Sequence, residues 1–330
     1  MRLRPIVILA VLGLGVLAAC SPDDDAVATV PAEAGFPMTI NNCGFEVTFE
    51  APPQRVVTVK SSTAEMMLAL GLGDRIVGTA FLDGPIPDAL ASAAAGTAVE
   101  HPLADRVPGT EATLALEPDL IFAGWESNIT TSGVGDRAAL AGFGVNTLVA
   151  PAACQAPPYR PESLTFDDVF AQLLLLGRLF DVPLVAEALV AEQRAALATV
   201  SADSRGLTAL WWSSGSDIPF VGGGIGAPQM LMTAVGLTNI AANIDESWSS
   251  FSWELVMAAD PDVLVLVDAD WNAAERKIEH LENHPGLREL TAVREGRFLI
   301  VAFPATEAGV RNVEAAQSLA TQLHALAFDD

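Results

Sequence analysis

Basic residues are scarce in this chain of 330 residues, which holds 17 lysines and arginines against 41 aspartates and glutamates. Its formal net charge at pH 7 is −24. A surface of this sign repels phosphate groups, which argues against a nucleic-acid partner and against adhesion to anionic lipid head groups. We therefore expect any contact with a membrane to depend on something other than charge.

Histidine is also scarce, and its four copies do not form a metal-ligand cluster. His280 and His284 are four residues apart, but Pro285 follows at once, so a solvated surface is favoured over a ligand pair. Three of the four histidines lie on late helices or loops with polar neighbours, so we expect no metal site. We also expect no bound cofactor.

Two motifs of enzymes are incomplete or out of place. A serine hydrolase needs Gly-x-Ser-x-Gly at a turn between strand and helix, and the segment Ser213–Ser216 lacks the leading glycine. Gly222-x-Gly224-x-x-Ala227 permits a dinucleotide-binding interpretation. The same glycines are explained more simply by a close approach of backbone to a ligand.

Only one long apolar run is present, and it lies at the N-terminus. Arg2 and Arg4 precede the run from 6 to 17, which is too short for a resident membrane helix and ends in Ala18-Ala19-Cys20. This pattern predicts a lipoprotein signal peptide over residues 1–19. We expect lipid on Cys20, a tether over residues 20–36 and an extracytoplasmic protein anchored to the membrane by that lipid.

Cysteine occurs three times, so Cys43 and Cys154 remain once Cys20 carries lipid. An exported location permits a disulfide between them, although two buried thiols are also possible. A bridge that closes so long a loop would contribute on the order of 3 to 5 kcal/mol.

One pattern occurs twice. Glu111-x6-Pro118-Asp119, followed by an apolar strand, returns as Glu254-x6-Pro261-Asp262, also followed by an apolar strand. A fixed short period would indicate a solenoid, whereas one duplication at half-chain spacing predicts two similar lobes. A cleft between lobes is a common binding site for small molecules.

Apolar strands alternate with helices in the first half of the chain, which predicts an α/β fold with a parallel sheet. Ser62-x-x-Glu65 is a capping-box pattern at the start of the first helix. The carboxyl ends of parallel strands carry the loops that contact ligands. The expected strands are 55–60, 76–81, 120–124 and 146–150, and the expected helices are 64–70, 111–116 and 136–143.

Two helices separate the halves. Thr165-x-x-Asp168 begins the first, and Asp181 with Pro183 begins a second that can run to about Arg205. At 1.5 Å per residue, the second helix would reach roughly 34 Å and could join the lobes as one rigid strut. We therefore expect an N-terminal lobe over 37–164, connecting helices over 165–205 and a C-terminal lobe over 206–330.

Several motifs together resemble a known family over about residues 45–325. The family comprises the substrate-binding lipoproteins of ABC importers that join two Rossmann-like lobes by one backbone helix, the class III periplasmic-binding-protein fold. Its members carry iron-siderophores, haem or cobalamin. The motifs are Arg55-Val56-Val57, the segment 65–78 with Leu70-Gly71-Leu72-Gly73-Asp74, Leu176-Gly177-Arg178, and the repeated Glu and Pro-Asp pairs.

The resemblance implies a role for two glutamates. One surface glutamate in each lobe of such proteins docks onto arginines of the permease, and Glu111 and Glu254 occupy the matching positions. The alternative is that both are ordinary first-turn residues favoured by the helix dipole. The implied partners are the permease, its ATPase and a small-molecule ligand, and we expect a monomer.

A narrower resemblance concerns the ligand. Four segments look like a branch proposed to import a precursor of the deazaflavin coenzyme F-420. Such a ligand needs aromatic surfaces for stacking and cations for its acidic tail, whereas an anionic ferric siderophore needs several arginines. The segments are 42–47, 81–84, 211–217 and 304–311.

Candidate ligand-binding residues follow the strands whose ends face the cleft. Trp125 and Trp212 end matching strands, so we expect them to face each other across a planar ligand. Lys60 and Arg311 would hold a phosphate or carboxylate, unless they form surface salt bridges. The full set is Lys60, Ser61, Ser62, Trp125, Glu126, Asn128, Trp212, Ser213, Trp248, Trp271 and Arg311.

The sequence thus predicts a lipid-anchored solute receptor that captures a small planar or chelate molecule and delivers it to an ABC permease without chemical change. The alternative from another class is an exported α/β enzyme that acts on a small molecule in the same cleft. Turnover of the bound molecule would distinguish the two.

Overall fold

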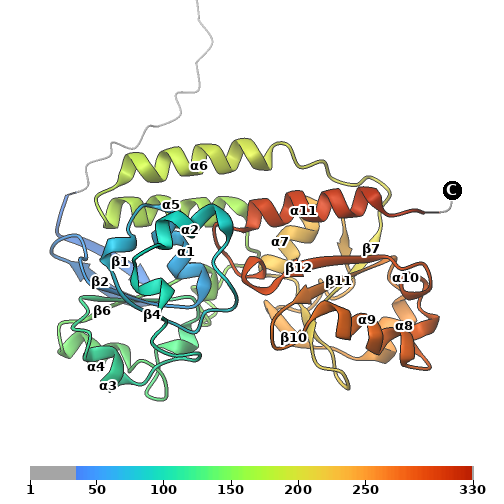
Figure 1. Ribbon diagram of the computed structural model, residues 1–330, viewed down its shortest axis with the longest axis horizontal. Coiled ribbons are helices and arrows are strands. Elements are labelled where there is room, and N and C mark those ends of the chain that lie inside the picture. The colour runs from blue at the N-terminus through green and yellow to red at the C-terminus, as the bar shows by residue number, and fades with distance from the viewer. Residues whose placement is uncertain (1–34, 329–330) are drawn as a thin grey trace, which may run out of the picture. The chain divides into compact units, whose positions relative to one another are not determined.

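The computed structural model describes residues 35–328 (Figure 1). The expected signal peptide, the lipid attachment at Cys20 and most of the expected tether lie outside the described residues. None of the described helices combines the length and the apolar character needed to cross a bilayer.

The N-terminal lobe is built on a parallel sheet with strand order β4-β3-β5-β6. Every strand is four or five residues long and is mostly buried, as expected for a sheet covered by helices. An antiparallel hairpin precedes the sheet. The elements are β1 (Met38–Asn42), β2 (Phe45–Phe49), β3 (Val56–Val59), α1 (Ser61–Ala69), β4 (Ile76–Ala80), α2 (Asp88–Ala94), α3 (Thr110–Leu114), β5 (Leu120–Ala123), α4 (Arg137–Gly142) and β6 (Asn146–Val149).

The C-terminal lobe has a mixed sheet in which β7, β11 and β12 are parallel. The expectation of a parallel sheet is correct for these strands and wrong for β8 and β10, which are antiparallel. The chain turns back after β7 at Gly215, whose φ of +78° suits glycine. The elements are β7 (Thr208–Ser214), β8 (Phe220–Gly222), α7 (Ala227–Ala234), β9 (Thr238–Asn239), β10 (Trp248–Ser250), α8 (Trp253–Ala259), β11 (Val263–Asp268), α9 (Ala274–Asn283), α10 (Thr291–Arg294), β12 (Phe298–Ala302) and α11 (Asn312–Ala325).

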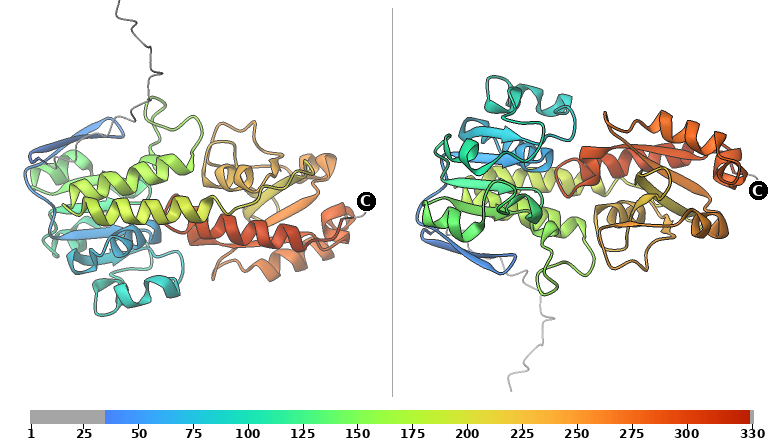
Figure 2. Two further views of the ribbon diagram at one scale, coloured as in Figure 1. Left: turned by 90° about the horizontal axis from the view of Figure 1, so that it is seen from above. Right: turned by 90° about the horizontal axis from the view of Figure 1, so that it is seen from below.

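Two helices, α5 (Phe166–Leu179) and α6 (Pro183–Leu197), pack side by side between the lobes in sequence (Figures 1 and 2). The expected start of a helix at Thr165 is confirmed, and a capping box forms there. The Thr165 amide donates to Asp168 Oδ2 over 2.8 Å, and the Asp168 amide donates to Thr165 Oγ1 over 3.2 Å. Pro183 is the first residue of α6. Proline is favoured at this position because the N–H that it lacks would have no partner within the helix.

The strut is shorter than expected, because α6 ends at Leu197 rather than near Arg205. The following residues, 199–206, include threonine, valine, serines, aspartate and glycine, all weak helix formers. The end of α6 instead meets α11, where Gln317 Nε2 donates to the Ala196 carbonyl over 3.2 Å and to Thr199 Oγ1 over 2.9 Å.

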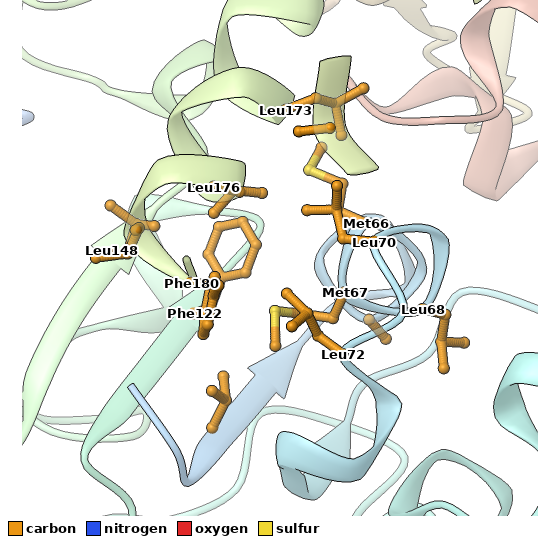
Figure 3. Packing of buried hydrophobic residues seen from close by; sticks show 14 of the residues in the cluster. Met66, Met67, Leu68, Leu70, Leu72, Phe122, Leu148, Leu173, Leu176 and Phe180 are labelled. Carbon is orange, nitrogen blue, oxygen red and sulfur yellow. The ribbon is translucent and has the colours of Figure 1, made fainter. Parts of the chain in front are cut away.

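Helix α1 supplies much of the core of the N-terminal lobe (Figure 3). Met66 and Leu70 lie near Leu173 of α5, and Met67 lies toward Phe122 of β5. Each such side chain contributes about 1.5 to 3 kcal/mol by full burial. The packing ties α5 to this lobe.

The expected capping box of α1 is wrong. The helix begins at Ser61 with Lys60 as its N-cap residue, and no side chain caps it. Glu65 turns instead to Arg311, a partner in the other lobe. The ion pair with Arg311, which is distant in sequence, thus takes the place of the capping bond that the local pattern Ser62-x-x-Glu65 predicts.

A buried lysine makes stability depend on pH. Lys277 Nζ donates to the carbonyls of Val267 and Asn272 over 2.6 and 2.7 Å, and burial lowers its pKa from 10.5 to about 8. Between these values the unfolded chain binds more protons than the folded one, so stability rises with pH.

Raising the pH from about 7.5 to about 9.5 should raise the urea concentration at the midpoint of unfolding. We expect a smaller rise for Lys277→Met than for the original protein, because the variant lacks the buried amine. The exposed neighbour Arg276 provides the control, since Arg276→Met should keep the full gain. Equal gains in all three proteins would contradict the depressed pKa.

Candidate ligand cleft

A cleft of about 490 Å³ lies between residues of the two lobes. It begins where β5 and β12 end, since Trp125 follows one strand and Phe303 the other. The loop before α5 and the segment before β10 form its other walls. The lining residues are Trp125, Ser127, Ala152, Ala153, Cys154, Gln155, Arg160, Ser213, Phe220, Glu246, Ser247, Trp248, Phe303 and Glu307.

Aromatic rings form the apolar surface of this cleft. Trp248 stacks on Phe220 with centroids 6.2 Å apart and an angle of 11° between the rings. Trp125 meets Phe81 edge to face over 5.7 Å. Trp271 also contacts Phe303 edge to face over 5.7 Å, but it is 57% exposed and lies outside the lining set.

Lys60 is buried beneath the aromatic rings rather than open to the cleft. Its Nζ lies 3.6 Å from the ring centroid of Trp125 and 4.4 Å from that of Phe81, and it pairs with Asp83. Burial raises the pKa of Asp83, and the charge of Lys60 opposes that rise. Ser61 joins the pair, because its Oγ accepts from the Asp83 amide over 2.8 Å.

Arg311 is also engaged in an ion pair. Its Nε donates to Glu65 Oε2 over 2.7 Å, and its Nη2 donates to the Pro85 carbonyl over 2.7 Å. Burial raises the pKa of Glu65, and Arg311 opposes that rise. Arg311 lines a separate cavity of about 180 Å³, so the structure places neither Arg311 nor Lys60 on the wall of the cleft.

Trp212 does not face Trp125, so that expectation is wrong. Trp212 is 2% exposed and packs edge to face on Trp253 over 4.9 Å. Its Nε1 donates to the Ser214 carbonyl over 2.8 Å. Strand β7 has neighbours on both edges, and alternation along it turns Trp212 into the core, while the next residue, Ser213, lines the cleft.

The other expected residues serve the cleft in different ways. Asn128 is buried, and its Oδ1 accepts from the Trp125 amide over 3.2 Å, so it positions that tryptophan. Glu126 Oε2 accepts from the Gln155 amide over 2.6 Å. Ser62 lines a small adjoining cavity of about 40 Å³, together with Trp248.

Cys43 and Cys154 form a disulfide, with their Cα atoms 5.1 Å apart. Cys154 also lines the cleft. The bridge attaches the loop that leads from β6 toward α5 to the hairpin at the start of the lobe, which fixes one wall of the cleft.

Arg160 was missed by sequence reasoning, although it lies in that loop. Its Nη2 donates to Asp245 Oδ2 over 2.8 Å, and its Nη1 donates to Glu246 Oε1 over 3.2 Å. Both carboxylates belong to the C-terminal lobe. The signal available in the sequence was its place shortly after Cys154, the expected disulfide residue.

Glu307 was also missed, although it belongs to a segment already matched to the narrower family branch. Its Oε2 accepts from Trp125 Nε1 over 2.8 Å. Its Oε1 is buried and has no hydrogen-bond partner among the described residues. Burial raises the pKa of Glu307, and the charge of Lys60 opposes that rise.

Glu111 and Glu254 lie away from the cleft lining, each exposed in the first turn of its helix, α3 or α8. Glu254 Oε2 accepts from Ser252 Oγ over 2.6 Å, and this bond lowers the pKa of Glu254. Their matching positions and their exposure leave both side chains accessible to a protein partner.

Comparison with known proteins identifies the family. The family model described as periplasmic binding protein matches residues 56–304, which include both sheets. The chain belongs to this family. That membership agrees with the expected class of fold, two α/β lobes with a cleft between them.

Three similar proteins illustrate the range of this periplasmic binding protein family. The ABC transporter substrate-binding lipoprotein YvrC of Bacillus subtilis, itself uncharacterized, is 25% identical over 89% of this chain and 88% of its own. A cobalamin-binding protein of Halobacterium salinarum is 28% identical over 80% of this chain and 68% of its own. A crystal structure from Saccharomonospora viridis, titled as an ABC-type Fe3+-hydroxamate transport system, is 31% identical with a TM-score of 0.75, over 88% of this chain and 100% of its own.

The buried pair beneath Trp125 yields a test of its structural role. Removing one partner of a buried ion pair leaves an uncompensated charge, so Lys60→Met should lower the free energy of unfolding by about 3 kcal/mol or more. The double variant with Asp83→Leu should recover much of that loss. Urea denaturation at neutral pH measures both.

The exposed pair Arg288–Glu289, whose Nε and Oε1 atoms are 3.1 Å apart, provides the control. Arg288→Met should change stability by less than about 1 kcal/mol. If Lys60→Met were equally mild, Lys60 would not be the buried partner that the geometry describes.

Proposed function

We propose that this chain is an extracytoplasmic solute-binding lipoprotein that captures a small planar or chelate ligand in the cleft and delivers it to an ABC importer. The observation that carries the proposal is the cleft itself. Aromatic rings and polar groups from both lobes line about 490 Å³, within the range of sites for small molecules. The ligand is bound and released without chemical change.

The relatives support a chelate or a corrinoid as the ligand. One is named for cobalamin and another for Fe3+-hydroxamate transport. Trp125, Trp248 and Phe220 would contact the flat or apolar surface of such a ligand, and Ser213 would offer a polar contact. Haem and the deazaflavin precursor are the other candidates that the aromatic walls suit.

Delivery requires a membrane and a transporter. In this proposal the lipid on Cys20 holds a monomer outside the membrane through the tether. Residues 37–164 and 206–330 act as the lobes, joined through 165–205. Glu111 and Glu254 present one carboxylate from each lobe to the permease, and the ATPase acts on the other side of the membrane.

Protein purified from its own host tests the capture of a ligand. We expect native mass spectrometry to show a bound molecule of constant mass, absorbance that reports a chelate, corrinoid or deazaflavin, and quenching of tryptophan fluorescence when the stripped protein is reloaded. Release of a chemically changed molecule would favour the exported enzyme. Absence of any retained or rebound molecule in host extract would contradict the proposal.

Docking has a separate test. Glu111→Ala and Glu254→Ala should each leave ligand affinity unchanged and reduce uptake by about tenfold, which corresponds to about 1.4 kcal/mol of docking energy. Glu282→Ala removes an exposed glutamate outside both positions and should leave uptake unchanged. Weaker ligand binding in either docking variant would show that the assignment is wrong.

A further inference from the structure

Two of the cleft's lining residues in the described chain, Glu246 and Glu307, are acidic. Among its lining residues in the described chain, Arg160 is the sole basic residue, and Asp245 and Glu246 already hold it. Lys60 and Arg311, the two cations that the sequence analysis expected there, pair with Asp83 and Glu65. An anionic ligand would therefore compete with carboxylates that already pair with each of these cations.

Glu307 is the acidic group whose bonding is incomplete. One oxygen accepts from Trp125 Nε1, and the other is buried with no partner among residues 35–328. A buried polar atom left without a partner costs roughly 1 to 3 kcal/mol. A ligand N–H, O–H or ammonium group placed against Oε1 would supply the missing hydrogen bond and remove that penalty.

The surroundings direct such a group to this position. Trp125 shares a hydrogen bond with Glu307, and both residues line the cleft, so a ligand stacked on the indole brings its edge near the carboxyl group. A ligand with a carboxylate or phosphate at that edge would instead bring a second acceptor against an oxygen that has no donor among the described residues. The same geometry therefore raises the affinity for a ligand with a hydrogen-bond donor at this edge and lowers the affinity for one with an acidic group there.

We infer that Glu307 is a specificity-determining residue, and that the cleft selects a neutral or positively charged ligand carrying a hydrogen-bond donor over an anionic one. This inference rests on the proposed function and narrows its ligand class. It favours neutral corrinoids and neutral or cationic hydroxamate chelates, and it disfavours a phosphate-bearing deazaflavin precursor and anionic siderophores.

A matched series of ferric chelates tests the inference. Ferrioxamine B carries a pendant ammonium group on a ferric trihydroxamate core, its N-acetyl derivative is neutral, and its N-succinyl derivative ends in a carboxylate. We expect the ammonium form to bind at least about tenfold more tightly than the carboxylate form, as measured by tryptophan quenching.

Glu307→Gln should bring the ammonium and carboxylate forms to within about threefold of one another, with little change for the neutral form. The amide oxygen can still accept from Trp125 Nε1, and an unchanged thermal midpoint would confirm that the variant folds. Glu162→Gln makes the same change of charge at an exposed residue outside the lining set and should preserve the full preference.

Salt separates a local contact from the general attraction of a chain with net charge −24. At about 1 M salt the Debye length is about 3 Å, so distant charges are screened. The preference of the original protein for the ammonium form over the carboxylate form should persist at that salt concentration. A carboxylate form that binds most tightly, a preference unaffected by Glu307→Gln, or an ammonium form that does not bind would each overturn the inference. The proposed function would still be tested separately, by whether protein purified from the host retains a molecule.

Discussion

The cleft depends on polar contacts that cross from one lobe to the other. Trp125 donates to Glu307, Arg160 donates to Asp245 and Glu246, and Arg311 pairs with Glu65. Because each contact joins residues far apart in sequence, the lobes are positioned by these bonds as well as by α5 and α6. The same bonds occupy Arg160 and Arg311, and the cleft is lined by aromatic rings and polar groups.

This division of roles explains how one cleft can be both stable and selective. The rings of Trp125, Trp248 and Phe220 offer broad surfaces that suit many flat or chelated molecules. In the account proposed above, polar selection comes from few groups, among which Glu307 has one buried oxygen without a partner in the described chain. Membership of the periplasmic binding protein family fits such a receptor, since a largely preformed site limits the entropy lost on binding.

The sequence predicted what depends on local pattern. Alternating apolar strands, the Thr165-x-x-Asp168 helix start and the repeated Pro-Asp turns predicted the two lobes and the position of the connecting helices. The placement of single side chains was less accessible, because it depends on which face of a strand they occupy. Trp212 and Ser213 are neighbours in sequence, yet Trp212 packs in the core and Ser213 lines the cleft, and strand ends alone could not assign them.

The second limit on prediction from the sequence was that it does not show which side chains become partners when they lie far apart in the chain. Lys60 and Arg311 look like free cations in the sequence, and only the fold brings Asp83 and Glu65 to them. Glu65 was instead assigned to a local capping box, which the structure replaces with the pair across the lobes. Arg160 and Glu307 were missed for the same reason, since their partners Asp245, Glu246 and Trp125 lie far away in sequence.

The most direct measurement of the central claim is hydrogen–deuterium exchange, recorded with and without the molecule that copurifies from the host. If one ligand bridges both lobes, amides of the segments 152–160, 244–250 and 303–309 should gain protection together, while α3 and α8 keep their exchange rates. Protection confined to one lobe, or located away from these segments, would contradict a receptor that binds its ligand between the lobes.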